Sequence, residues 1–189
     1  MTISWALLAS TFLATTSPSF ANPSGGTVTG GSATISGEGS SHVIIDQTSD
    51  RAFIEWQDFS VGSNEQVSFQ HGHASAITAN KVIGTNPSEI LGRIQADGQI
   101  FIINGNGVIF GESSVIDAAG MLATTHNLDM ADFMAGTDPL DLSGGTEAII
   151  NNGNIAIREG GFAALLAPHI INNGVISARL GKVTIGASE

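Results

Sequence analysis

The residues best suited to chemistry in this chain are its five histidines, and their spacing assembles no site. His71-Gly72-His73 would place two imidazoles on the same side of a strand, because side chains alternate between the two faces. A metal site normally needs three or four convergent ligands, and neither a carboxylate nor a third histidine stands within a few residues. His42, His126 and His169 are isolated in the sequence. We therefore expect an exposed turn at residues 71–73, no metal site and no cofactor.

The acidic residues form no recognisable catalytic pair. Asp46 and Asp50 flank a predicted turn, and Asp129 stands where a helix cap is expected. Cysteine is absent, which excludes a cysteine nucleophile, thiolate ligands and disulfides. Ser113 and Ser114 lack the G-x-S-x-G frame of a nucleophile elbow. We predict that the chain is not an enzyme, although carboxylates paired across neighbouring strands of a solenoid would be invisible in a linear sequence.

A glycine-rich turn, Asn104-Gly105-Asn106-Gly107, separates two apolar runs. With Gly111, its glycine spacing fits neither the dinucleotide fingerprint nor the phosphate-binding P-loop, and no lysine follows. Asn-Gly is a strong hairpin signal, but a hairpin with one solvated face should alternate apolar and polar residues. Continuous apolar runs are instead typical of buried parallel strands. The pattern therefore predicts a corner in a stack of parallel strands.

The composition favours one turn-rich β domain. Of 189 residues, 42% are hydrophobic, only 12% are charged and 24 are glycine. The net charge of -11 argues against nucleic-acid binding through phosphate neutralisation and against adhesion to an anionic membrane. After the N-terminal segment, no run reaches the roughly 18 apolar residues of a membrane-spanning helix, so we expect no direct membrane insertion.

The first 21 residues are predicted to be a signal peptide. Trp5 to Leu13 is a short apolar core, and Ser19-Phe20-Ala21 places small residues at both positions of an A-x-A-like cleavage site. Cleavage is expected before Asn22, which leaves residues 22–189 as one exported domain. Residues 1–4 lack the Lys or Arg that such a peptide normally carries, so the true start codon is left open.

An internal repeat predicts the architecture. IINGNGVI, IINNGNIA and IINNGVIS start at Ile102, Ile149 and Ile170, and one period of about 21 to 24 residues covers all three, with one rung unrecognised after the first. Long amphipathic helix pairs and the leucine-rich frame are both absent. A parallel β-helix fits this period, with room for at most about eight rungs. Aligned corner asparagines can form a ladder, for which Asn104, Asn151 and Asn172 are the candidates.

One short helix is expected outside this stack. Residues 129–134 are the only convincing helical stretch, with Asn127 or Asp129 as the N-terminal cap and Gly136 as the stop.

The order of these motifs resembles the filamentous haemagglutinin N-terminal domain, which is the two-partner secretion (TPS) domain of Gram-negative exoproteins. The segments that carry the resemblance are Arg51-Ala52 through Trp56 and Phe59, Asn86-Pro87-Ser88 with Ile90 and Gly92, Gly98 through Asn104, Gly120-Met121-Leu122-Ala123-Thr124-Thr125, Leu128-Asp129 and Gly181-Lys182-Val183.

The resemblance implies an all-β fold, a right-handed parallel β-helix with an N-terminal cap and small extra-helical elements. It implies a secretion signal that nucleates folding and is recognised in the periplasm by the POTRA domains of a partner outer-membrane transporter. The product would be a monomer, secreted or held at the cell surface, with any adhesin, haemolysin or toxin activity downstream. Family members usually read N-P-N-G where this chain has Gly105, and proline would stiffen that turn.

Two other functions are left open by the residues. A stand-alone adhesin or carbohydrate-binding β-helix would bind cells or glycans without a transporter. A polysaccharide-degrading β-helix would show turnover that depends on one carboxylate.

Overall fold

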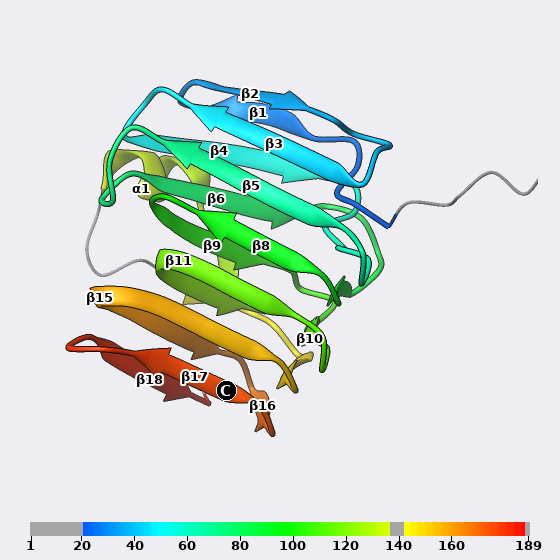
Figure 1. The fold of residues 1–189 in the computed structure, drawn as a ribbon, viewed down its shortest axis with the longest axis vertical. Helices are drawn as coiled ribbons and strands as arrows, with labels where there is room; N and C mark the ends of the chain where they lie inside the picture. Colours follow the sequence, from blue (N-terminus) through cyan, green and yellow to red (C-terminus); the bar gives the residue numbers. More distant parts are fainter. Residues whose placement is uncertain (1–20, 137–141, 188–189) are drawn as a thin grey trace, which may run out of the picture.

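The computed structural model describes residues 21–136 and 142–187. The predicted signal peptide therefore lies almost wholly outside the described residues. Nearly all of the described chain is β-strand, wound into a solenoid of about 6 turns with one short helix (Figure 1). This confirms the predicted parallel β-helix.

Three parallel sheets form the sides of the solenoid. The first contains β3 (His42–Gln47), β5 (Gln66–His71), β8 (Arg93–Ala96), the first part of β11 (Val115–Thr124), the first part of β15 (Asn154–Leu166) and β17 (Val175–Ala178). The second contains β4 (Arg51–Trp56), β6 (Ile77–Val82), β9 (Gln99–Ile103), the later parts of β11 and β15, and β18 (Lys182–Gly186). The third contains β7 (Ser88–Ile90), β10 (Val108–Phe110), β14 (Ala148–Asn151) and β16 (His169–Asn172).

Strand register confirms one of the two repeat intervals and corrects the other. Ile149 in β14 pairs with Ile170 in β16, as the repeat predicts. Ile102, however, lies in β9 on the second sheet, and Val108 is the residue that pairs with Ile149. The prediction that Ile102 occupies the same position as Ile149 and Ile170 was wrong. An apolar run that ends in Asn and Gly can form a corner after a strand of either the second or the third sheet.

The rung predicted between the first and second copies is absent, because β10 pairs directly with β14, and the extra residues form an excursion from the solenoid. Between β10 and β14 the chain leaves the coil after β11 through β12 (Asn127–Leu128), α1 (Met130–Ala135) and β13 (Leu142–Ser143), where β12 and β13 pair antiparallel. The excursion and the N-terminal cap consume the residues that an eight-rung count would assign to extra turns.

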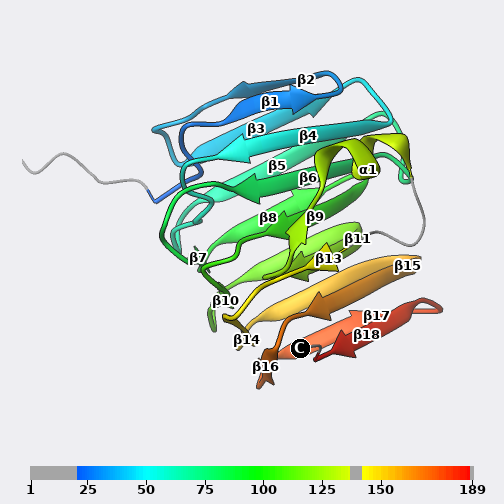
Figure 2. The ribbon, with the colours of Figure 1, turned by 180° about the vertical axis from the view of Figure 1, so that it is seen from behind.

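The helix forms where its local signals predict. The Asp129 side chain accepts hydrogen bonds from the backbone N–H groups of Ala131 and Asp132, which caps α1. Gly136 ends the helix in a left-handed conformation with φ of 71°. Figure 2 shows α1 lying over the sheet that contains β4, β6 and β9.

An antiparallel cap closes the N-terminal end. β1 (Thr27–Gly30) pairs antiparallel with β4, and β2 (Ala33–Ser36) pairs antiparallel with β3. Because an open sheet edge presents unpaired backbone groups, these two strands protect the first turn from pairing with other chains. The last turn, β16 to β18, lies at the opposite end of the molecule (Figure 1).

Two apolar clusters explain the sequence of β9. Ile100 and Ile102 point into the main core inside the coil, whereas Phe101 and Ile103 belong to a second cluster with Phe133 of α1. The rings of Phe101 and Phe133 meet edge to face, with centroids 5.8 Å apart. Because β9 is buried on both sides, its apolar run shows no polar alternation.

Candidate functional site

The Asn104–Gly107 turn joins β9 to β10 and packs against the corner that precedes β7. Asn104 is fully buried. Its Nδ2 donates to the carbonyl oxygen of Asn86 and to Oγ of Ser88, each at 3.0 Å. One amide side chain therefore ties together two successive rungs of the solenoid.

The same asparagine also shapes its own turn. Its Oδ1 accepts from the backbone N–H of Asn106 at 2.9 Å and from Asn106 Nδ2 at 3.1 Å. Asn106 Nδ2 also donates to the carbonyl of Gly84 at 2.9 Å. The side-chain donors and acceptor of Asn104 are thus all used, which is what a buried amide requires. We call residues 84–88 and 104–107 the asparagine corner.

Two glycines have different roles in this corner. Gly107 has φ of 111°, a conformation that favours glycine, and its N–H donates to the carbonyl of Asn104. Gly105 is not among the described residues with positive φ. A Cβ at Gly105 would meet only the carbonyl oxygen of Thr125, at 3.8 Å. A Cβ at position 105 would therefore meet no close contact.

Sequence reasoning missed Ser88 as a partner of Asn104. The signal was present as a small polar residue directly after Asn86-Pro87, but the register that brings it to Asn104 comes only from the pairing of β7 with β10.

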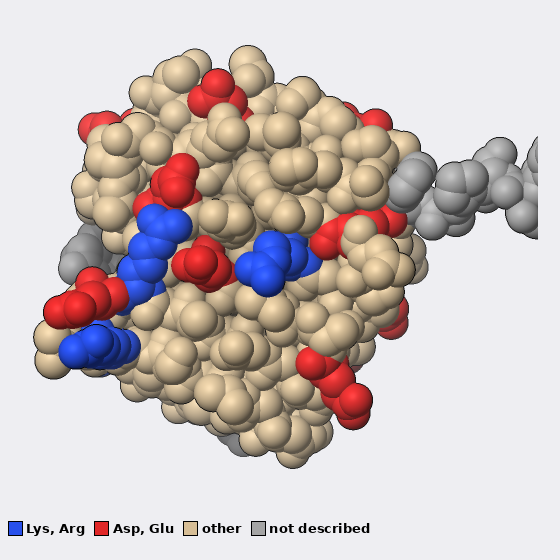
Figure 3. Space-filling view, in the orientation of Figure 1, with Lys and Arg blue, Asp and Glu red and all other residues tan. Residues whose placement is uncertain are grey.

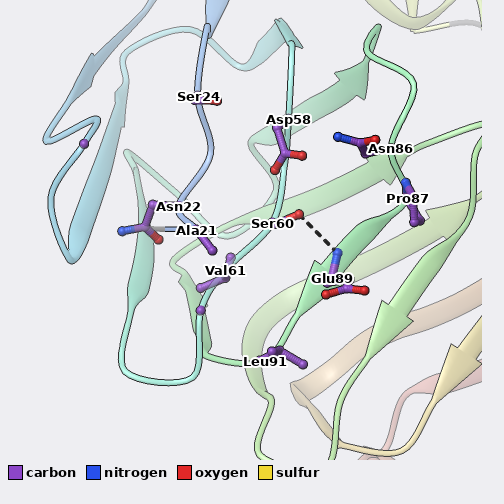
Figure 4. Close-up of a pocket in the computed structure, with 12 residues that line it drawn as sticks. Ala21, Asn22, Ser24, Asp58, Ser60, Val61, Asn86, Pro87, Glu89 and Leu91 are labelled. Atoms are coloured by element: carbon purple, nitrogen blue, oxygen red, sulfur yellow. Dashed lines mark hydrogen bonds between the residues drawn. The ribbon is translucent and has the colours of Figure 1, made fainter. Parts of the chain in front are cut away.

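Hollows lie on both sides of the asparagine corner. One is a cleft of about 570 Å³ with Asn86, Pro87 and Glu89 on one wall and the N-terminal segment on the other (Figure 4). The second, of about 350 Å³, lies between Gly105-Asn106 and the β12–β13 excursion. Gly105 is exposed and Asn106 half-buried, so the turn offers a backbone and one amide to solvent.

The other residues of the family pattern are mainly structural. Arg51 Nη1 donates to the carbonyl of Phe133 at 3.0 Å and its guanidinium lies over the Phe133 ring, which attaches α1 to the solenoid. Trp56 is buried and its Nε1 donates to Oδ1 of Asn80 at 3.1 Å. A Cβ at Gly120 would come within 2.8 Å of the Phe162 ring.

Ala123 and Thr124 are also buried, on the later part of β11. Thr124 Oγ1 accepts from the N–H of His126 at 3.1 Å, and His126 Nδ1 contacts the carbonyl of Gly144. These contacts hold the excursion against the solenoid.

Asn104 has no part in the side-chain contacts between asparagines of successive rungs, which join Asn151 to Asn172 and Asn152 to Asn173. Asn151 Nδ2 donates to Asn172 Oδ1 at 2.7 Å, one rung further along. The pairing register places Phe110, not Asn104, beside Asn151. The expectation that Asn104 shares this ladder is corrected because β9 runs on a different sheet from β14.

His71 is half-buried at the end of β5 and belongs to a hydrogen-bonded network, so the exposed turn expected at 71–73 is wrong for this residue. Its Nδ1 accepts from the N–H of Gly98 and its Nε2 contacts Thr78 Oγ1, each at 2.9 Å. Burial lowers the pKa of His71 from 6.5 to about 4, against the opposing influence of Asp97. His73 is exposed and lies 3.0 Å from Asp50. Within residues 21–136 and 142–187, no cluster of three His, Cys, Asp or Glu could hold a metal ion.

Charged groups are sparse on the face shown in Figure 3, and most of the blue residues there lie beside red ones. Among the described ion pairs, Arg158 lies 3.5 Å from both Asp97 and Asp117. In the described part of the chain, no helix has the length and apolar character needed to cross a membrane.

Comparisons with known proteins agree with the fold. The family model described as TPS secretion domain matches residues 19–189. A heme/hemopexin-binding protein of Haemophilus influenzae is 38% identical over 99 residues, which are 52% of this chain and 11% of that protein. Its counterpart from strain Rd is 36% identical over 107 residues, or 57% of this chain and 12% of the relative. The chain thus spans a small part of these relatives.

A solved structure shows the same architecture. The crystal structure of the HMW1 secretion domain from Haemophilus influenzae covers 87% of this chain with a TM-score of 0.79 at 27% identity, and the match covers 45% of that chain.

Proposed function

Because the chain belongs to the TPS secretion domain family of two-partner secretion exoproteins, we propose that it is recognised in the periplasm by the POTRA domains of a partner outer-membrane transporter and then nucleates folding outside the cell. The family is one of secretion domains and not of enzymes. The comparisons give no support to a stand-alone adhesin or to a polysaccharide-degrading enzyme.

The observation that carries this proposal is the complete burial of Asn104 within the asparagine corner. In the folded chain no partner can touch this side chain. We propose that the transporter recognises the Asn104–Gly107 segment while the chain is still extended, by adding it to the edge of a POTRA sheet. On folding, the same amide turns inward and joins two rungs. Asn104 would thus serve recognition first and folding afterwards.

Two features of the chain support export before folding. Cleavage before Asn22 would release the domain into the periplasm, and the absence of cysteine means that no disulfide can lock it there in a folded state. Each rung buries its apolar side chains only against its neighbours, so folding can proceed rung by rung as the chain emerges. We propose that this folding helps to draw the chain outward, and that the product is a secreted or surface-held monomer.

Transporter-dependent export of residues 1–189 tests this function. The full chain, joined to a small cysteine-free epitope, would be produced in cells with and without the cognate transporter. We expect the epitope in the medium only when the transporter is present. Equal amounts in the medium without it, or retention in the periplasm with a competent transporter, would contradict the proposal.

A further inference from the structure

The cleft beside the asparagine corner is lined by acidic side chains and by no basic ones among the described residues. Its walls include the carboxylates of Asp58 and Glu89 and the hydroxyl of Ser60, whose Oγ accepts from the Glu89 N–H at 3.3 Å (Figure 4). None of the described residues that line it is Lys, Arg or His. A negative cleft of this composition favours a positively charged group over an anion.

The start of the domain lies inside this cleft. Ser24 forms an antiparallel bridge with Asp58, with the N–H of Ser24 donating to the Asp58 carbonyl at 3.0 Å. This bridge fixes the segment before the cap, so that Ala21 and Asn22 line the cleft opposite Asn86 and Pro87 (Figure 4).

Glu65 is not among the residues that line the cleft, but it accepts a hydrogen bond from the backbone nitrogen of Ala21, which does line it. Its Oε1 accepts from the N–H of Ala21 at 3.0 Å, and its Oε2 accepts from the N–H of Gly62 at 2.9 Å. The second bond fixes the orientation of the carboxylate. Glu65 is therefore held with one oxygen directed at the chain where cleavage is predicted.

A buried acceptor in the same cleft has no donor. Asn22 is 6% exposed, and its Nδ2 donates to the carbonyl of Ser40. Its Oδ1 is buried and has no hydrogen-bond partner among the described residues. An unpaired buried acceptor costs free energy, which a nearby N–H donor would recover.

We propose that this cleft is the binding site for the α-ammonium group that processing creates on Asn22. The proposal rests on the cleavage site that is part of the proposed function. Hydrolysis of the Ala21–Asn22 amide by a signal peptidase consumes one water. It leaves a carboxylate on Ala21, which departs with the leader, and an amine on Asn22, which takes up a proton at neutral pH.

The new ammonium group can bond to both the unpaired Oδ1 of Asn22 and the carboxylate of Glu65. It carries three N–H donors where the Asn22 amide carries one, so it can serve the adjacent Oδ1 and still donate to a carboxylate. Removal of Ala21 frees Oε1 of Glu65 for that role. Processing would thus replace a hydrogen bond from a neutral amide N–H to the Glu65 carboxylate by one between two opposite charges, and tie the N-terminus to the cap.

Reactivity of the α-amino group tests the site without the transporter. The full chain would be exported to the periplasm of cells that lack the transporter, purified, refolded and checked by mass spectrometry for an Asn22 N-terminus. Acylation by an N-hydroxysuccinimide ester at pH 7 would then be followed at the α-amino group, with Lys81 and Lys182 as internal references. Glu65→Gln removes the charge and keeps the shape, and the exposed Glu159→Gln is the matched control.

We expect the α-amino group to react about tenfold more slowly in the wild type and in Glu159→Gln than in a free peptide of residues 22–27, which corresponds to one pKa unit. Glu65→Gln should restore much of the peptide's rate. A folded wild type that reacts as fast as the peptide would overturn the proposal whether or not Glu65→Gln folds, and so would an N-terminus other than Asn22. Protection without transporter-dependent export would leave the site standing and contradict only the secretion function.

Discussion

The two ends of the solenoid differ in how completely their rungs are covered. One column of the second sheet runs from Ile54 in β4 through Asn80, Ile102, Ala123 and Leu165 to Ile185 in β18. Ile54 is 0% exposed and Ile185 is 49% exposed, although both occupy the same position in their rungs. The difference comes from the neighbours, since Ile54 lies under the β1–β2 cap and Ile185 belongs to the last turn within the described residues, with no further described turn stacked on it.

This comparison shows that a residue's contribution depends on the rungs beside it more than on its type. Each turn of a solenoid contacts only the next turns, so stability is approximately a sum of neighbour interactions. The capped end also holds the large aromatic residues Trp56, Phe59 and Phe69, all buried. We expect local stability to fall from the cap toward β16–β18. Three matched pairs of variants test that gradient, and a fourth experiment tests the turn at Gly105.

The largest effect should come from the matched pair at the ends of the column. Ile54→Ala removes a side chain that is fully enclosed, which typically costs about 2–5 kcal/mol in the free energy of unfolding. Ile185→Ala should cost less than about 1 kcal/mol, because its side chain is already half in water. Urea denaturation followed by circular dichroism measures both. Equal losses would contradict a graded solenoid.

A second matched pair compares the asparagine corner with the ladder near the open end. Asn104→Ala leaves several buried polar groups without their partner, among them Ser88 Oγ and the N–H of Asn106, and we expect a loss of about 2–3 kcal/mol. Asn172→Ala removes the bond from the buried Asn151 to Asn172. Because Asn172 lies on an exposed strand, where water can take its place, we expect a loss of about 1 kcal/mol or less. A larger loss for Asn172→Ala, by the same urea titration, would reverse the proposed ranking.

Acid should lower the stability of the capped half of the solenoid, because His71 there is neutral in the folded chain and must take up a proton. Its pKa in the folded chain, about 4, lies below the unfolded value of 6.5, so the unfolded state binds the proton more readily. The stability contributed by neutral His71 is complete above pH 6.5 and is lost as the pH falls toward 4. Asp97 and His73 act on the same ring and are retained in the test. Between pH 7 and 5, His71→Gln should show a flatter stability profile than wild type, while the exposed His169→Gln should match wild type.

The smallest effect should be a gain in stability from a substitution in the Asn104–Gly107 turn. Gly105→Pro adds a Cβ where the structure has room for one and reduces the freedom of the unfolded chain, which we expect to add about 0.4–1 kcal/mol to the free energy of unfolding. Thermal unfolding at fixed pH measures this gain. A decrease would show that position 105 needs a backbone conformation that proline cannot adopt.

The sequence was sufficient to predict those elements whose structure depends only on residues close to them in the chain. Asp129 and Gly136 predict α1 because a cap and a left-handed stop act within one helix. The 21-residue spacing between Ile149 and Ile170 is visible because nothing interrupts that turn. The place of Ile102 was beyond sequence reasoning, since its apolar run is followed by the same Asn-Gly signals as runs on the third sheet.

The contacts of the candidate site required the register. Asn104 could be predicted as a corner residue, but its bonds to Asn86 and Ser88 follow from the pairing of β7 with β10. The continuous apolar run of β9 similarly depends on Phe133, which a helix far along the chain supplies from outside the coil.

We propose that the transporter recognises Asn104 before this residue is buried. Measuring how the transporter binds an unfolded chain tests this proposal most directly. Trp56→Ala and Phe59→Ala together should keep the chain unfolded, since both side chains are buried and in edge-to-face contact. Circular dichroism would verify this before the periplasmic domains of the transporter are titrated in.

In that background, Asn104→Ala cannot act through the fold. We predict that the unfolded chain binds the transporter domains, that adding Asn104→Ala weakens binding at least about tenfold, or 1.4 kcal/mol, and that adding Asn172→Ala leaves it unchanged. Binding that is equal with and without Asn104, or that requires the folded chain, would contradict the account.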